Sequence, residues 1–371
     1  MQVCKNTCGS LNNKCRGRDA ELGGGKVRGK RRRETSRVTL NDVAQKAGVS
    51  PITVSRALNR PEKVTDELRE AILETVKALG YVPDFAARAL ASRTNNVVGV
   101  LSSMLGSSIF PPVMKGIEDR MRDTGMRIQY VNTTFDPEEE IHQLKQFFAQ
   151  NPTGIIIGGV QIDPRVTDLL RASPCPVVQF IDISYPAIDM AIGVDNRAAG
   201  MVAINHLLER GYRRIGFCSG RIDIPVTMRL ESFKQRMSEE GLFDPNLVIS
   251  VTAENPISLG GEILDRLLAE APDLDAILCA HDDLAIAVLF ECQRRGIKAG
   301  ANLGVCGFTD IDYAAHVFPS LTTVRMPLYQ LGYSAANMIL RVQEGRKHTE
   351  PVDLGFKLIE RESTRRSAEG A

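Results

Sequence analysis

The strongest chemical signal in the sequence is a short stretch with polar and basic side chains at helical spacing. In a helix beginning at Pro51, Val54 and Leu58 would face a core. The side chains left facing outward would be Ile52, Thr53, Ser55, Arg56 and Asn59. A short helix with such an outer face, following another helix and a tight glycine turn, is typical of a helix-turn-helix that contacts DNA. Similar helix pairs also occur in proteins that bind no DNA, so this pattern alone leaves both interpretations open.

Three helices are needed to position this face. The sequence predicts them over Leu40–Ala47, from Pro51 to about Leu58, and from Thr65 to Leu79. Thr39 and Ser50 are suited to cap the first two helices, because a hydroxyl oxygen can accept from a free backbone N–H. Asp42 would complete a capping box with Thr39. Between these helices, Gly48 can adopt the positive φ that ends the first one.

The charge distribution favours a nucleic-acid partner for this region. Residues 1–93 carry 19 Lys and Arg against 10 Asp and Glu, whereas the remaining residues carry 27 against 35. Residues 1–36 read as a disordered basic tail, in which Lys30 to Arg33 are either a solvated run or extra phosphate contacts. The tail has no apolar signal segment, so we expect a cytoplasmic protein that associates with the nucleoid when bound to DNA.

Beyond residue 96, short β-branched runs alternate with amphipathic helical stretches. The expected buried parallel strands cover Val97–Leu101, Ile128–Val131, Ile155–Gly158, Val177–Ile181, Ile215–Cys218, Ile277–Ala280 and Val305–Gly307. This pattern predicts an α/β fold with doubly wound parallel sheets and ligand sites at the carboxyl ends of strands. No phosphate-binding glycine loop, serine elbow or HExxH motif is present, which argues against an enzyme and against a cofactor. Cys4, Cys8 and Cys15 have no His nearby, so we expect no metal site.

Several strings resemble the LacI/GalR family of bacterial transcriptional regulators. They are VTLNDVAQKAGVSPITVSRALN (38–59), GVDNRAAG (193–200), CAHDDLAIAV (279–288) and GVCGFTDID (304–312), and the resemblance extends to about Ser363. It implies a head over 37–82, a hinge helix over 83–95, and a periplasmic-binding-protein-like core of two subdomains over 96–371. The chain would cross between the subdomains near 195 and 324. The partners implied are inverted-repeat operator DNA, a small-molecule effector and a second copy of the chain.

The resemblance also implies which residues contact DNA. The set is Thr39, Leu40, Ser50, Pro51, Ile52, Thr53, Ser55, Arg56, Asn59, Ala87, Arg88 and Leu90. Ile52, Thr53 and Arg56 would read bases. The side chains better suited to phosphate contacts are Thr39, Ser50, Ser55 and Asn59. Leu90 matches the family's minor-groove wedge, although packing within its own domain is the alternative. Many members carry Tyr and a polar residue where this chain has Pro51 and Ile52, so the operator cannot be carried over.

The implied effector cleft lies between the two subdomains. Its candidate residues are Ser103, Phe110, Asp182, Arg229, His281, Asp282 and Asp310, with Phe110 as a stacking face. Arg229 matches the family's effector-binding arginine. Asp282 can equally be the N-cap of the next helix, and His281 can equally be a structural residue. This chain departs from the family pattern at Ser232, Thr309 and His281, where many members carry other residue types.

The segments 290–300 and 353–363 look most like the gluconate-operon repressor branch of the family. An arginine beside a protonated or donor-rich histidine would suit a carboxylate. The sequence therefore predicts a dimeric DNA-binding regulator, most simply a repressor, controlled by a sugar acid such as gluconate or 2-ketogluconate. The alternative class is a solute-binding protein or a sugar-metabolising enzyme built on the same α/β core.

Overall fold

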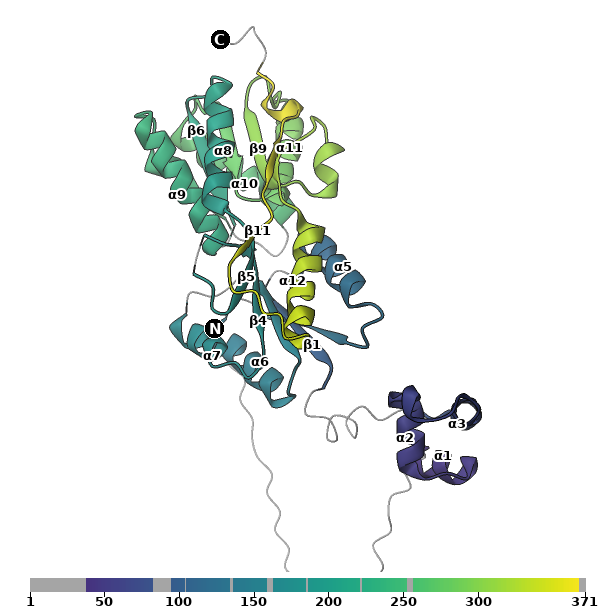
Figure 1. Cartoon of the computed structure of the whole chain (residues 1–371). Helices are drawn as coiled ribbons and strands as arrows, with labels where there is room; N and C mark the ends of the chain where they lie inside the picture. The colour runs from purple at the N-terminus through teal and green to yellow at the C-terminus, as the bar shows by residue number, and fades with distance from the viewer. Residues whose placement is uncertain are drawn as a thin grey trace, which may run out of the picture. The chain divides into compact units, whose positions relative to one another are not determined.

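The computed structural model describes residues 38–82, 95–103, 105–133, 136–158, 163–184, 186–220, 222–251 and 256–366. The chain divides at residue 84 into two compact units. The first is a small helical head and the second is a larger α/β core (Figure 1). Each unit has buried hydrophobic residues of its own.

The head consists of three α-helices and one short 3-10 helix. Their bounds are α1 Leu40–Ala47, α2 Pro51–Asn59, η1 Pro61–Lys63 and α3 Asp66–Leu79. The predicted capping box is present, because Thr39 and Asp42 each accept from the other's backbone N–H. Gly48 ends α1 with a φ of 68°, which glycine adopts without steric strain. Ser50 caps α2, and Thr65 caps α3.

The three helices of the head meet at one small core. Its buried residues are Val43, Ala44, Val54, Ala57, Ile72 and Tyr81. Val54 is fully buried as predicted, whereas Leu58 is only half-buried and Ala57 takes the second inward position on α2. Because Val54 and Ala57 define the inner face of α2, Ile52 and Arg56 lie on its exposed face.

The first sheet of the core is parallel throughout. Its strands, in spatial order, are β11 Val352–Asp353, β5 Met190–Val194, β4 Val177–Asp182, β3 Gly154–Gly158, β1 Val97–Ser102 and β2 Arg127–Asn132. Its helices are α5 Phe110–Met121, α6 Pro137–Ala149, α7 Pro164–Arg171 and α12 Leu328–Gln343. Val98 and Val100 of β1 cluster with residues of α5, whereas Val97 and Leu101 cluster with those of α6 and α7. Both faces of the sheet are therefore covered.

The second sheet repeats this arrangement with one antiparallel edge strand. Its spatial order is β12 Lys357–Ile359, β10 Thr322–Arg325, β9 Gly304–Thr309, β8 Ala276–Cys279, β6 Ile215–Ser219 and β7 Val248–Ser250. The antiparallel pair is β10 with β12. Its helices are α8 Asn196–Glu209, α9 Ile224–Glu239, α10 Gly260–Glu270 and α11 Asp282–Arg295. Short 3-10 helices are η2 Pro245–Leu247, η3 Pro256–Leu259, η4 Asp312–Ala315 and η5 Glu362–Thr364.

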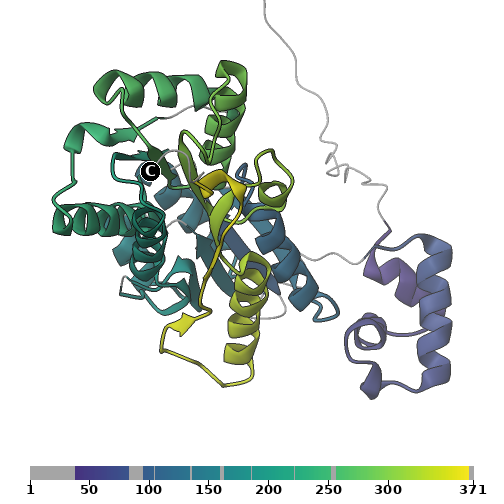
Figure 2. The same ribbon diagram turned by 90° about the horizontal axis from the view of Figure 1, so that it is seen from above.

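The chain passes between the two sheets three times. It leaves the first sheet after β5, returns after β10 through α12, and crosses again between β11 and β12. The family resemblance predicts crossings near 195 and 324 and does not predict the one between β11 and β12. The second crossing lays α12 beside α5, which is about 220 residues earlier in the chain (Figure 1; Figure 2). A Cβ on Gly332 of α12 would lie only 2.0 Å from the Val113 carbonyl oxygen, so this close approach requires glycine.

The predicted fold class is confirmed, since both sheets are dominated by parallel strands flanked by helices. One detail of the prediction is wrong. The strand expected to be buried over Ile128–Val131 lies at the edge of the first sheet, and Arg127 and Gln129 in it are exposed. Its apolar residues resemble those of a central strand, but only one of its sides has a neighbouring strand.

Candidate functional site

Two short-range pairs of polar residues, Thr39 with Asp42 and Ser50 with Thr53, fix the starts of α1 and α2. The Thr39 hydroxyl donates to Asp42 Oδ2 at 2.7 Å, and the hydrogen bonds from Thr39 lower the pKa of the Asp42 carboxyl. Ser50 Oγ accepts from the Thr53 backbone N–H at 3.2 Å and lies 2.8 Å from Thr53 Oγ1. These three hydroxyls, predicted to contact DNA, therefore already have partners within the head, and their DNA contacts stay a prediction.

The exposed side of α2 forms one wall of a shallow groove. The residues that line the groove are Leu40, Pro51, Ile52, Ser55, Arg56, Arg60 and Lys63. Five of them belong to the predicted DNA set, and sequence reasoning did not include Arg60 or Lys63. Arg56, Arg60 and Lys63 are exposed, so the groove carries positive charge that can attract phosphates. Asn59 lies at the end of α2, while Ala87, Arg88 and Leu90 fall outside the described residues.

In the core, Arg229 on α9 is the centre of a buried polar cluster. Only 2% of its surface is exposed. Its Nε and Nη2 both donate to Asn196 Oδ1, at 3.0 and 2.7 Å, and its Nη1 donates to the Ala280 carbonyl oxygen at 2.7 Å. The guanidinium also lies over the Phe308 ring, 3.7 Å from its centroid. The orientation of Arg229 is therefore fixed by α8, β9 and the end of β8.

Asn196 connects Arg229 to the first sheet. Its Nδ2 donates to Asp182 Oδ2 at 2.6 Å, and Asp182 is the last residue of β4. Asn196 itself begins α8, directly after the chain has left β5. A continuous hydrogen-bonded chain from Asp182 through Asn196 to Arg229 thus joins the two sheets of the core. Sequence reasoning did not select Asn196, although it lies in the GVDNRAAG string at a strand-to-helix junction.

Asp282 is not the N-cap of α11, so that interpretation is wrong, whereas its role in effector binding stays a prediction. The N-cap position of α11 is His281, and Asp282 is the first residue inside the helix. The buried carboxylate of Asp282 accepts from Thr323 Oγ1 at 2.6 Å and from the Ile311 backbone N–H at 2.9 Å. It therefore ties α11 to β10 and to the segment after β9.

The other predicted effector residues occupy different environments. The Asp310 carboxylate pairs with Arg325 at 2.6 Å and with Arg361 at 2.8 Å, so two arginines already balance its charge. Phe110 is fully buried in the hydrophobic core, edge-on to Tyr130, and it exposes no face for stacking. The interpretation of Phe110 as a stacking residue is therefore wrong for this structure. Ser103 follows β1, and its buried Oγ has no hydrogen-bond partner among the described residues.

Burial controls the ionisation of this cluster. It raises the pKa of Asp182 and of Asp223, the N-cap of α9, and raises that of Asp282 to about 6. Burial also lowers the pKa of Arg229 to about 10, so the guanidinium stays charged at neutral pH. Burial and the neighbouring Arg229 lower the pKa of His281 to about 3. These shifts favour the neutral form of the His281 imidazole.

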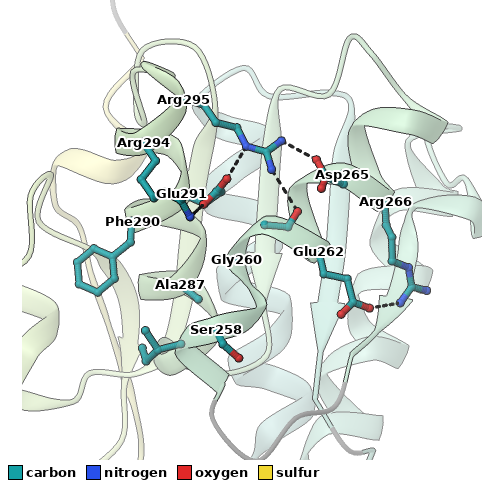
Figure 3. Close-up of a pocket in the computed structure, with 12 residues that line it drawn as sticks. Ser258, Gly260, Glu262, Asp265, Arg266, Ala287, Phe290, Glu291, Arg294 and Arg295 are labelled. Atoms are coloured by element: carbon teal, nitrogen blue, oxygen red, sulfur yellow. Dashed lines mark hydrogen bonds and ion pairs between the residues drawn. The ribbon is translucent and has the colours of Figure 1, made fainter.

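A second concavity lies away from the predicted residues, between α10 and α11. Figure 3 shows Arg295 reaching from α11 to Asp265 on α10 at 2.7 Å, with Glu291 on its other side at 2.7 Å. Phe290 stands at the edge of this groove and is 42% exposed. The charged groups here are paired with one another, and the exposed surface beside them is apolar.

Two further observations concern the described part of the chain. It holds no group of three or more His, Cys, Asp or Glu side chains arranged to bind a metal ion. Cys4, Cys8 and Cys15 fall outside it. Each helix in this part is too short or too polar to span a membrane.

Comparison with known proteins identifies both units. Residues 39–84 match the family described as bacterial regulatory proteins, lacI family, and residues 204–364 match a periplasmic binding protein-like domain. A regulator of Pseudomonas aeruginosa named HTH-type transcriptional regulator GntR is 34% identical over 336 residues, which are 90% of this chain and 98% of that protein.

Solved structures give the same result for the fold. A LacI family transcriptional regulator from Silicibacter pomeroyi has a TM-score of 0.81 and 29% identity, over 89% of this chain and 100% of its own. A transcription regulator GntR from Chromobacterium violaceum has a TM-score of 0.68 and 32% identity, over 72% of this chain and 99% of its own. The likeness therefore extends over both units and is not confined to the head.

Proposed function

The chain belongs to the LacI family of bacterial regulatory proteins, and on this premise we propose that it is an operator-binding repressor controlled by a sugar acid. The observation that carries the proposal is the combination of two units in one chain. A head with a basic groove along α2 is joined to a core in which Arg229 lies at the junction of two sheets. The first unit is suited to DNA and the second to a small anion.

The effector site is proposed around Arg229. Ser103, Asp182, His281, Asp282 and Asp310 are the remaining residues of the predicted set that lie at strand or helix ends, while Phe110 is left out. A guanidinium binds a carboxylate through parallel N–H donors, and nearby carboxylates and hydroxyls accept from sugar hydroxyls. The Ser103 hydroxyl, which has no hydrogen-bond partner in the described part of the chain, supports this site, because a buried polar group without a partner is unfavourable until a ligand supplies one.

The proposed effector is gluconate or 2-ketogluconate. Two of the similar proteins are regulators named GntR. These names fit the gluconate-operon branch that segments 290–300 and 353–363 resemble. In this site the carboxylate would bind Arg229, while the neutral His281 imidazole would supply a single N–H donor or one acceptor. This differs from the protonated histidine first considered, and it leaves Arg229 as the cation that selects an acid.

The control of DNA binding is proposed to act through the junction between the sheets. Asp182 belongs to the first sheet, Arg229 and Ala280 to the second, and Asn196 lies where the chain crosses. A ligand that bonds to both sides would favour one arrangement of the two subdomains over another. If the two arrangements hold the heads differently, effector binding and operator binding become linked. In this proposal the hinge residues Ala87, Arg88 and Leu90 also contact the operator.

A dimer is proposed as the state that binds an inverted repeat. Large apolar side chains are exposed on η3, α11, η4 and the segment after η4: Ile257 39%, Phe290 42%, Tyr313 66% and Phe318 75%. The segment carrying Phe318 adjoins α11, because Gln293 of that helix donates to the Phe318 carbonyl oxygen. Ile257 and Phe290 line the groove of Figure 3. Exposed apolar surface of this kind is suited to burial against a second copy.

Fluorescence anisotropy with the labelled upstream region of the protein's own gene tests the proposal. Binding is measured at one fixed salt concentration, against an unrelated duplex, with and without gluconate and 2-ketogluconate. We expect specific binding that one of the two acids shifts several-fold. Specific binding that neither acid changes would refute the sugar-acid part only, and equal affinity for both duplexes would refute the regulator.

A further inference from the structure

The most exposed large hydrophobic residue described in the head lies on α2. Ile52 is 64% exposed and occupies the second position of the helix, after Pro51. The apolar residues of α2 that serve the core, Val54 and Ala57, are on the other side. The exposure of Ile52 is therefore not required by the fold of the head, and a polar residue there would be equally compatible with it.

The surroundings of Ile52 indicate which kind of surface it contacts. Leu40 and Pro51 line the same groove and make its apolar part, whereas Arg56, Arg60 and Lys63 make its basic part. The basic part complements the phosphates of a duplex. Arg56 follows Ile52 by four residues, so the two side chains lie one above the other on the same face of α2. An aliphatic group and a guanidinium are thus presented together to whatever enters the groove.

Duplex DNA offers one matching apolar group. On the base edges of the major groove, the C5-methyl of thymine is the apolar feature, and guanine presents the acceptors that suit an arginine. On the premise of the DNA-binding function proposed above, we propose that Ile52 selects thymine at one position in each operator half-site by contact with its C5-methyl.

The chemistry of isoleucine suits this role. Two substituents on Cβ restrict its χ1 to one strongly preferred rotamer within a helix, so its methyl groups are held in a defined place. Loss of one buried methyl lowers the affinity for DNA by about fourfold. Loss of a methyl in both half-sites bound by a dimer lowers it by about fifteenfold. The base pair read by Ile52 lies close to the one read by Arg56, because the two residues are one helical turn apart.

Deoxyuridine substitution tests this contact directly, because deoxyuridine lacks only the C5-methyl of thymine. In the duplex that the wild-type protein binds specifically, symmetric pairs of thymines are replaced one position at a time. We expect one position at which wild-type affinity falls about fifteenfold. The Ile52→Ala variant should bind the thymine duplex more weakly than wild type but lose less than twofold on substitution at that position.

The matched control is Leu73→Ala, which removes an exposed aliphatic side chain from α3, outside the groove. It should keep the full deoxyuridine effect. Circular dichroism of each variant verifies that the head is folded. A wild-type protein that tolerates deoxyuridine at every position, or an Ile52→Ala variant that retains the full loss, would overturn the assignment while specific binding itself persists. Absence of specific binding would instead refute the DNA-binding function and the assignment with it.

Discussion

Replacement of Arg229 by lysine separates the shape of the guanidinium from its charge. In the protein, Nε and Nη2 share Asn196 Oδ1 while Nη1 reaches the Ala280 carbonyl oxygen. A lysine ammonium is a single point donor on a flexible stem, so it cannot satisfy Asn196 and Ala280 and also present parallel N–H groups to a carboxylate. Arg229→Lys therefore keeps the positive charge and loses the geometry.

The size of the effect follows from the bonds lost. A hydrogen bond to a charged group contributes about 1.5–3 kcal/mol. Loss of one such bond to the sugar acid weakens its binding by about 10- to 100-fold. Loss of two of the three polar bonds within the protein lowers the free energy of unfolding of the core by about 3–6 kcal/mol. Operator binding without effector should change by less than about threefold, because the head is a separate compact unit.

Isothermal titration calorimetry measures the affinity for whichever acid shifts operator binding, and urea unfolding measures the stability of the core. Arg236→Lys is the matched control. Arg236 lies two turns further along α9, and its Nε donates to Asn205 on α8 at 2.8 Å, as Arg229 does to Asn196. This control should leave the affinity for the acid unchanged.

The reasoning fails if Arg229→Lys binds the acid within about threefold of wild type. It also fails if Arg236→Lys lowers the affinity for the acid as much as Arg229→Lys does, because the loss would then come from altered packing of α8 against α9. A variant that binds acid weakly but has wild-type stability would assign Arg229 to the ligand alone and refute its proposed part in joining the two sheets.

Two further outcomes are expected. Burial, with Asp163 nearby, raises the pKa of Glu140 from 4.5 to about 7, so its stabilising contribution is complete below pH 4.5 and is lost as the pH rises through 7. Glu140→Gln should accordingly raise the free energy of unfolding by up to about 3 kcal/mol at pH 8 and by almost nothing at pH 4, and a pH-independent difference in urea melts would contradict this. Phe318→Asp places a charge in the proposed dimer surface and should yield monomers in analytical ultracentrifugation at micromolar concentration, whereas an unchanged sedimentation coefficient would exclude this surface.

The head could be predicted in detail because its signals are local. Thr39 with Asp42 and Ser50 with Thr53 are each three residues apart, so the caps depend on the backbone of one helical turn. The bounds of α1 and α3 follow from the Thr39 and Thr65 caps and from the glycines that end the two helices. The order of parallel strands and helices in the core was similarly visible from its alternating apolar runs.

The candidate effector site was less predictable, because its contacts join distant parts of the chain. Arg229 came from resemblance, and the partners that orient it could not be inferred, since Asn196 precedes it by 33 residues and Ala280 follows it by 51. Asp282 accepts a hydrogen bond from Thr323, which is 41 residues further along the chain. Phe110 illustrates the opposite error, because an aromatic residue near a strand end can face either a cleft or a core.

Local signals in the sequence were enough to indicate the class of this protein: a capped helix-turn-helix in a basic N-terminal region, followed by a doubly wound α/β core. Hydrophobic periodicity, caps and charge are properties of short segments, so they can be recognised before the fold is known. Tertiary contacts set the ionisation preferences and partners of the polar groups in the core, such as the lowered pKa of the half-buried His281 and the two arginines that balance Asp310. Those properties depend on desolvation and on distances between segments, which exist only once the two sheets have come together.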